Sequence, residues 1–376
     1  MADKELAFRL KAARESLGIN LMEASRRLGF PHYQTLSNIE AGEREVKVSE
    51  LAKFAKVYFI SVSKLLGQTD DKSTYTFLWR NPPQFEEMKK ETEAEIFYRC
   101  EQYHLLENLL KLKRKRGFLD VSIEDIRTNH GINDIASEYR MLLGLGNRPA
   151  FTLQKALEQD YAVKILFYSL PEGSSASTIH SDFGGVIVIN LDEAPWRRKY
   201  DLAHELFHLI TWNAVPFEDL KDESFFKDIE KKADKFASML LLPENEVRKE
   251  IGNRLEAQEH LAYSDLVDIA INFGVSTVAL LYRLAYLGFI DWETADKVAK
   301  DEELSELSRQ KRKYERWEQP VSERFHSLAI RCLRKGLISR GKFAEIVGID
   351  RSEIDDFIDD TGLMESEGTP IEIVAR

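Results

Sequence analysis

Apolar residues recur at helical spacing through the first 67 residues, and no strand-like alternation interrupts them. The first predicted helix carries apolar residues three or four positions apart: Leu6, Leu10, Ala13 and Leu17. Gly18 ends this helix, and serines that can cap the last two of the following helices precede their apolar residues. These further helices are predicted at Met22–Leu28, His32–Ala41, Ser49–Tyr58 and Ser61–Leu66. Residues 1–67 are therefore predicted to form an all-α domain.

A polar segment separates this domain from a second helical pattern. Residues 68–83 (QTDDKSTYTFLWRNPP) are predicted to be a linker, because the Pro82-Pro83 pair interrupts any helix. Gln84–Arg116 is predicted to be one long helix that ends in the basic run Lys111–Arg116, before Gly117. Such a run either complements the negative end of a helix or contacts DNA, and we favour the first interpretation.

Residues 118–290 show a mixed pattern that predicts an α+β domain. Ala162–Tyr168 and Gly185–Asn190 are rich in β-branched residues and are predicted to be strands. The Gly- and Ser-rich segment Glu172–Asp182 between them is predicted to be a loop. Predicted helices, separated in part by an acidic loop at Pro216–Asp228, cover Ile135–Leu145, residues 200–212, Ile229–Leu242 and further segments up to Phe289.

Helical patterns return after residue 290. Residues 291–319 are strongly charged and are predicted to form one solvated connecting helix. Ser322–Asp359 is helical again, and the stretch from Gly341 has the spacing of a small helix-turn-helix-like unit. The final residues IEIVAR are expected to form a short strand or a tail. Residues 291–376 are thus predicted to be a C-terminal helical region, and the chain as a whole is predicted to be mainly α with a small β-sheet.

Composition and charge restrict the class of protein. The chain has 376 residues, enough for two or three domains, and a net charge of −11. Residues 1–67 hold eleven Lys and Arg against eight Asp and Glu, so this segment alone carries +3. DNA binding is therefore expected only from this local basic part. Two distant cysteines, the absence of a signal-peptide pattern and the absence of a membrane-length apolar run lead us to expect a cytoplasmic protein without a disulfide framework.

The segment Tyr200–Trp212 contains the motif His204-Glu205-Leu206-Phe207-His208. Histidines four apart on a helix lie on one face, so both imidazoles can hold one metal ion. Glu205 is then placed to act as a general base on a metal-bound water. The alternative is a pair of ordinary histidines on a buried helix, but such a pair with a glutamate needs polar partners, and a metal satisfies all three groups.

A catalytic zinc needs a third protein ligand, and the strongest candidate lies on the next helix. Glu230 and Asp234 are four apart, so that Glu230 can bind the metal and Asp234 can hydrogen-bond a ligating histidine. Ala233 and Ala237 are small enough for a close approach of the two helices. The spacing alone equally fits a solvent-facing acid pair, and other acids remain alternative ligands: Glu218, Asp219, Asp222 and Glu223.

The mechanism expected of such a site is metal-assisted hydrolysis of a peptide bond, with Glu205 moving the proton. Zn²⁺ is the expected metal, although Mn²⁺ or Fe²⁺ can occupy the same ligands. The strand Gly185–Asn190 is interpreted either as an edge that pairs with an extended substrate or as an ordinary core strand.

Residues Asn20–Gly42 have the helix, tight turn and second helix of a helix-turn-helix unit. The second helix is expected to enter the major groove of double-stranded DNA, where amide and hydroxyl side chains read bases or bind phosphates. Its candidate DNA contacts are His32, Tyr33, Gln34, Thr35, Ser37 and Asn38. A helical bundle that binds a protein remains the alternative. Because one such unit binds weakly, a homodimer on two half-sites is expected.

Two stretches of the chain resemble known families. Residues 6–66 resemble Xre/Cro-type phage repressors through LKAARESLGI, TLSNIEAGER and LAKFAKVYFISVSKLL. Residues of about 135–290 resemble the ImmA/IrrE metallopeptidases, which are similar to thermolysin-like zinc peptidases, through IVINLDEAPWRRKYDLAHELFHLI and EKKADKFASMLLLP. The second resemblance implies a zincin-like domain with His204, His208 and Glu230 as ligands and Glu205 as base.

The combination implies a DNA-binding transcriptional regulator with a built-in zinc metalloendopeptidase. Members of the second family cleave partner repressors, so the implied protein substrate is a repressor, an antitoxin or the chain itself near residues 68–83. The competing hypothesis is a non-proteolytic repressor or antitoxin in which the peptidase-like domain is a sensor or a protein-binding module.

Overall fold

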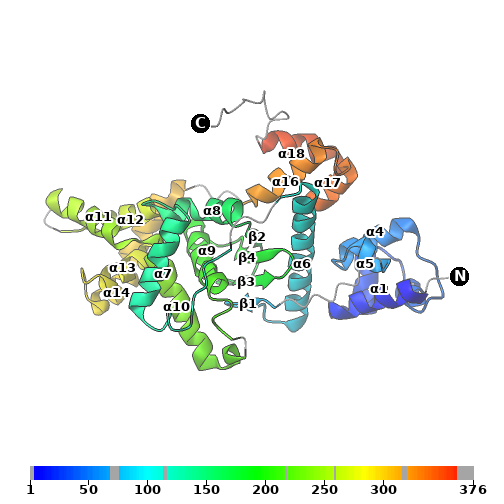
Figure 1. Ribbon diagram of the computed structural model, residues 1–376, viewed down its shortest axis with the longest axis horizontal. Coiled ribbons are helices and arrows are strands. Elements are labelled where there is room, and N and C mark those ends of the chain that lie inside the picture. The colour runs from blue at the N-terminus through cyan, green and yellow to red at the C-terminus, as the bar shows by residue number, and fades with distance from the viewer. Residues whose placement is uncertain are drawn as a thin grey trace. The chain divides into compact units, whose positions relative to one another are not determined.

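The computed structural model describes residues 4–67, 76–112, 117–216, 218–257, 260–315 and 320–361 (Figure 1). These residues divide into two compact units. The first unit is built from the described parts of Met1–Lys72, Glu86–Lys113 and Ser322–Arg376, and the second from those of Ser73–Phe85 and Arg114–Val321. This division differs from the predicted domain boundaries, because residues 86–112 join the N-terminal and C-terminal helices and residues 291–315 join the central domain.

Residues 4–67 form the short helices that the apolar spacing predicted: α1 (Lys4–Ser16), α2 (Leu21–Leu28), α3 (Tyr33–Glu40), α4 (Val48–Val57) and α5 (Val62–Leu65). Leu10, Leu36 and Phe54 are fully buried in their shared core. Asn20 caps α2 by accepting a hydrogen bond from the Glu23 N–H, and Gly29 ends it with a φ of 75°. Residues 21–40 thus have the helix-turn-helix arrangement.

Of the two predicted serine caps, the structure confirms one. Ser61 does cap α5, since its side chain accepts the Lys64 N–H. The cap of α4 is Lys47 and not Ser49, so that prediction was wrong. The reason is that Glu50 reaches back to accept the Lys47 N–H at 2.9 Å and is itself held by Arg44 at 2.7 Å, which starts the helix earlier.

A buried ion pair ties α1 to α3. Arg14 donates to both carboxylate oxygens of Glu40 at 2.8 and 2.9 Å and to the Ile19 carbonyl oxygen at 2.9 Å. The two side chains are only 9% and 5% exposed. Hydrogen bonding to Glu40 raises the pKa of Arg14 despite its burial, so the guanidinium stays charged. Because both side chains are buried, removal of Arg14 leaves the Glu40 carboxylate without its bidentate partner.

We expect Arg14→Ala to lower the free energy of unfolding of the α1–α5 domain by about 3 kcal/mol, because Glu40 is left buried without its counter-charge. Native-state hydrogen exchange of the α1 and α3 amides measures this effect within the whole chain. Lys11→Ala is the matched control, since Lys11 lies on the same helix with a side chain 53% exposed. An equal loss of protection in both variants would contradict the assignment.

The rest of the first unit packs around α6 (Glu86–Leu109), which contacts α16 (Glu323–Arg334) and shares a core with α17 (Arg340–Val347) and α18 (Ile354–Asp360). The predicted helix end at Arg116 was wrong, because Lys111 takes a left-handed φ of 52° and α6 has already ended. Residues 113–116 of the basic run lie outside the described residues. The predicted helix-turn-helix-like spacing corresponds to α17, Gly348 and α18, whereas the predicted strand or tail at residues 371–376 lies outside the described residues.

The second unit contains a four-stranded sheet in the order β1-β3-β4-β2 among the described residues. Its strands are β1 (Leu78–Trp79), β2 (Lys164–Tyr168), β3 (Ser175–His180) and β4 (Gly184–Asn190), and only the β2–β4 pair is parallel. Two predictions were wrong here. The predicted loop contains β3, and the predicted linker contains β1. Both strands are short and are ordered by pairing with neighbouring strands, which a local sequence pattern does not reveal.

α8 (Leu153–Asp160) and α9 (Pro195–Ile210) contact this sheet. The other helices of the unit are α7 (Asn129–Leu142), α10 (Glu223–Leu241), α11 (Glu244–Ala257), α12 (Tyr263–Phe273), α13 (Thr277–Tyr286), α14 (Trp292–Ala299) and α15 (Glu302–Lys311). α10 begins before the predicted Ile229, because Asp222 caps it through the Phe225 N–H. The predicted connecting helix at 291–319 was also wrong. Asp291 and Asp301 each cap a separate helix, and Leu304 is buried in the core.

The central helix α9 contacts β3 and β4 as well as α10, and every residue from Asp201 to Ile210 is buried. The chain is thus mainly α with a small sheet, as predicted. In the described part of the chain no single helix is both long and apolar enough to cross a membrane; α12 and α13 reach that length and composition only together, bent by 98°.

Candidate metal centre

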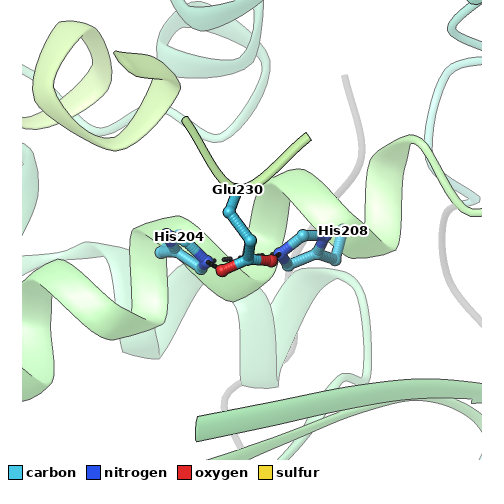
Figure 2. A group of neighbouring side chains, drawn as sticks. All are labelled: His204, His208 and Glu230. Carbon is cyan, nitrogen blue, oxygen red and sulfur yellow. Dashed lines mark hydrogen bonds and ion pairs between the residues drawn. The ribbon is translucent and has the colours of Figure 1, made fainter. Parts of the chain in front are cut away.

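Two histidines of α9 and one glutamate of α10 converge on a single point. Figure 2 shows the carboxylate of Glu230 between the imidazoles of His204 and His208. Its two oxygens lie 3.2 Å from Nε2 of His204 and 3.1 Å from Nε2 of His208. The two Nε2 atoms are themselves 3.2 Å apart. The structure therefore brings together the three side chains that the sequence put forward as ligands.

The geometry of these donor atoms fits a small divalent cation. Ligand atoms about 2.1 Å from a tetrahedral ion lie about 3.4 Å from one another. The three donors here all lie within 4.8 Å of one another, and two imidazole nitrogens with a carboxylate oxygen form a set that zinc prefers. No other group of this kind occurs among the described residues.

The packing of α10 against α9 decides which acid joins the histidines. Ala233 and Ala237 are fully buried, and their small side chains allow the close approach that places Glu230 beside the motif. The four other candidate acids do not join His204 and His208 in this group. Glu218 pairs with Lys221, Asp222 caps α10, Glu223 pairs with Lys227, and Asp219 belongs to the short helix before α10.

Asp234 fixes the orientation of the first histidine. The His204 Nδ1–H donates to Oδ1 of Asp234 at 2.9 Å, so that Nε2, on the other side of the ring, faces Glu230 and is the nitrogen placed toward a metal. Arg80 in turn donates to Asp234 at 3.1 Å and to the buried Asp201 at 3.0 Å. Sequence reasoning missed Arg80, because it lies in the predicted linker and no local pattern marks it.

Burial and the nearby charged groups shift the pKa values of three side chains at this site. Burial lowers the pKa of His204, but hydrogen bonds to Asp234 and Glu230 outweigh it and raise that pKa to about 9. Burial raises the pKa of Glu230, yet hydrogen bonds from both histidines hold it well below its usual range. Burial raises the pKa of Asp201 to about 6, although Arg197 and Arg80 oppose the shift. Glu230 is thus held as a carboxylate, the form in which a glutamate side chain can bind a metal.

Glu205 is buried on the same helix, and within the described part of the chain only one of its two carboxylate oxygens accepts a hydrogen bond. Ser175 on β3 donates from Oγ to Oε1 of Glu205 at 2.6 Å. The other oxygen, Oε2, is buried and has no hydrogen-bond partner among the described residues. A buried carboxylate oxygen is costly unless a donor satisfies it, and a water at the metal site is such a donor. Sequence reasoning missed Ser175, because its strand was predicted to be a loop.

The predicted edge strand Gly185–Asn190 does not lie at an edge. β4 is hydrogen-bonded to β3 on one side and to β2 on the other, so the interpretation as a substrate-pairing edge was wrong. Its residues from Val186 to Asn190 are buried, as expected of a core strand.

We expect Asp234→Asn to weaken zinc binding about 10- to 100-fold, the usual effect of losing an orienting carboxylate behind a ligating histidine. Competition with a chromophoric chelator measures the affinity. Asp228→Asn is the matched control, because Asp228 lies on the same helix, pairs with Lys232 and has a side chain 56% exposed. Equal affinities of the two variants would show that Asp234 has no such role.

The candidate DNA contacts lie on or next to α3. Leu36 and Ile39 face the core, whereas Tyr33, Gln34 and Asn38 are exposed and His32 precedes the first turn. Thr35 and Ser37 are partly buried. The exposed face of α3 therefore presents an imidazole, a phenol and two amides to solvent.

Comparison with known families finds a match for two regions of the chain. Residues 158–285, which include the metal-centre residues of α9 and α10, match a peptidase family model described as the IrrE N-terminal-like domain. Residues 10–65 match a helix-turn-helix family model. A search of curated proteins found no match. The chain therefore joins an Xre-like helix-turn-helix DNA-binding domain to an IrrE/ImmA-like peptidase-family domain.

Proposed function

We propose that this protein is a transcriptional regulator whose second unit is a zinc-dependent endopeptidase. The observation that carries the proposal is the arrangement of His204, His208 and Glu230 beside a buried glutamate with one open oxygen. The domain match supports the same class of protein. Zinc is the metal that suits these ligands best, and Mn²⁺ or Fe²⁺ are the alternatives.

Each residue has a distinct role in the proposed hydrolysis. His204, His208 and Glu230 would hold the metal, which would lower the pKa of a bound water and polarise a peptide carbonyl. Glu205 accepts a proton from the attacking water through Oε2, the oxygen without a hydrogen-bond partner in the described part of the chain, and returns it to the leaving amine. Ser175 holds the other oxygen of Glu205 and so fixes the direction in which the base acts. Asp234 keeps the His204 proton on Nδ1.

The first unit is proposed to bring this activity to an operator. Gln34 and Asn38 are suited to bidentate contacts with adenine, and the other candidate contacts of α3 can bind base edges or phosphates. Because a single helix-turn-helix unit binds weakly, we propose that the protein acts as a homodimer on two half-sites. The protein substrate is proposed to be a partner repressor, an antitoxin or the chain itself.

The proposal is tested by comparing new protein N-termini in cells that carry the wild-type chain or Glu205→Gln. A specific cleavage that occurs only with the wild-type chain would identify the substrate. If both chains regulate the same genes and no cleavage differs between them, the second unit acts instead as a sensor or a protein-binding module. Metal content of both purified proteins shows that they differ only in the base.

A further inference from the structure

A short segment that precedes α6 in sequence lies along the strand next to the metal centre. Leu78 and Trp79 pair antiparallel with Ser177 and Ala176 of β3. The Arg80 N–H donates to the Ser175 carbonyl oxygen at 3.0 Å. At the ends of the segment, Thr178 Oγ1 donates to the Thr76 carbonyl oxygen at 2.7 Å and Ser174 Oγ donates to that of Asn81. Thr76–Asn81 is therefore bound by its backbone to the strand that carries the Glu205 partner.

Alternate side chains of this segment reach both sides of the metal centre. Leu78 lines a small apolar cavity together with His208, Trp212, Val215, Phe226 and Ile229. Arg80, two residues on, donates to Asp201 and Asp234, and Asp234 holds His204. Because side chains of a strand alternate between its faces, Leu78 and Arg80 lie on the same face, the one directed toward His204 and His208. The segment thus spans the site from one histidine to the other.

The strand β1 also differs in origin from the other three strands. β2, β3 and β4 lie within residues 158–285, which match the peptidase family, whereas β1 comes from residues 78–79. Without β1, β3 is an open edge with unpaired backbone groups above the metal site. Such an edge is the kind of surface that binds an extended peptide through its main chain and selects its side chains through pockets.

We infer that the edge of β3 is the substrate groove of the peptidase and that Thr76–Asn81 occupies it as a substrate strand would. This inference rests on the proposed function. A protein substrate must displace the segment before it can bind. Because the segment and the groove belong to one chain, the segment competes with the substrate at an effective concentration on the order of millimolar. The segment therefore keeps the cleavage of other proteins low until it leaves the groove.

The occupied groove also indicates the class of substrate. The position that Leu78 occupies beside His208, next to Trp212 and Ile229, suits an apolar side chain. The carboxylates of Asp201 and Asp234 accept a guanidinium or ammonium group two residues later. Arg80 and Asp234 also border a cavity of about 460 Å³ lined by Trp196, Tyr200 and Tyr282, which leaves room for a long side chain. The preferred substrate is an extended segment with an apolar residue and, two positions on, an arginine or lysine.

A reversible lock and a release variant test the inference on the full chain loaded with zinc. Phe77→Cys/Thr178→Cys places two cysteines opposite each other one residue beyond the Leu78–Ser177 pair, off the face that contacts the ligands. Oxidation then fixes the segment on β3 and reduction frees it. Leu78→Asp/Trp79→Ser replaces the two apolar side chains of β1 by polar ones and is designed to release the segment. Phe85→Ser is the control, because Phe85 is 62% exposed in the same stretch of chain.

The probe is a labelled peptide with the sequence of residues 74–84, TYTFLWRNPPQ. Binding is measured in the Glu205→Gln background, and cleavage in chains that keep Glu205. We expect the release variant to bind the peptide at least tenfold more tightly than the wild type and the Phe85→Ser control. The oxidised lock is expected to bind at least tenfold more weakly than the same protein after reduction. Circular dichroism and zinc content establish that all variants are folded.

The outcomes test the substrate groove and the proposed peptidase activity independently. If the peptide binds in the expected order but is not cleaved, the groove is established and the proposed peptidase activity fails. If it is also cleaved in that order, both stand. If the locked, wild-type and released proteins bind the peptide equally, or none binds it, then β1 is a permanent strand of the fold and the inference is overturned.

Discussion

Replacing Glu205 by glutamine is expected to lower the rate of peptide cleavage by about 10²- to 10⁴-fold, the usual contribution of a general acid–base group. Glutamine has nearly the same shape and can still accept the hydrogen bond that Ser175 donates, but it cannot take up a proton. Because Glu205 is not among the candidate ligands, zinc content is expected to remain unchanged. Cleavage of a quenched peptide by the release variant measures the rate.

The matched control for this change is Glu223→Gln. Glu223 lies at the exposed start of α10, pairs with Lys227 and has a side chain 81% exposed. We expect this control to cleave at the rate of its parent. A Glu205→Gln protein that retains zinc and cleaves as fast as the control would remove Glu205 from the mechanism.

The double change Gln34→Ala/Asn38→Ala is expected to weaken specific operator binding by about 10²- to 10⁴-fold, since each bidentate base contact contributes about 1–3 kcal/mol. Both side chains are exposed on α3, so their removal leaves the core residues Leu36 and Ile39 untouched. An operator selected from random DNA with the wild-type chain provides the probe, and the affinity is measured by fluorescence anisotropy at several salt concentrations.

Non-specific DNA is the internal control for this experiment. Contacts to phosphates, and not contacts to bases, set the salt dependence of binding. We therefore expect affinity for unrelated DNA and the salt slope to stay unchanged in the double variant. Equal losses of specific and non-specific binding would show that these residues contact the backbone, and no loss of either would move the DNA interface away from α3.

Local spacing was enough to predict the part of the site that lies on helices. His204 and His208 are four apart, as are Glu230 and Asp234, so each pair shares a face wherever its helix packs. The proximity of the two pairs was not fixed by spacing. It depends on the approach of α10 to α9 over Ala233 and Ala237, which the sequence only made possible. The resemblance to a family decided between Glu230 and the other acids.

The part of the site that lies on strands could not be predicted. Ser175 belongs to a run of small polar residues that has little intrinsic preference for a strand, and its backbone is ordered by pairing with β4 and β1. Arg80 reaches Asp201 and Asp234 across 121 and 154 residues of sequence. Contacts of such separation leave no local pattern, so β3 was interpreted as a loop and β1 as part of a linker.

The division into two units escaped prediction for a similar reason. The helical pattern of residues 84–116 indicated a helix but not its partners. Tyr103 and Leu106 of α6 are fully buried against Phe325 and Leu328 of α16, more than 200 residues away. Apolar spacing identifies the face that a helix buries, whereas the partner of that face is set by the tertiary fold.

Elemental analysis of the chain purified without chelator is the most direct test of the central claim. It is performed beside the variant His204→Ala/His208→Ala, with circular dichroism to establish that both proteins are folded. The account predicts about one zinc per wild-type chain and none in the variant. A wild-type chain that binds no metal even after zinc is supplied, or a variant that retains it, would contradict the assignment of a metallopeptidase site.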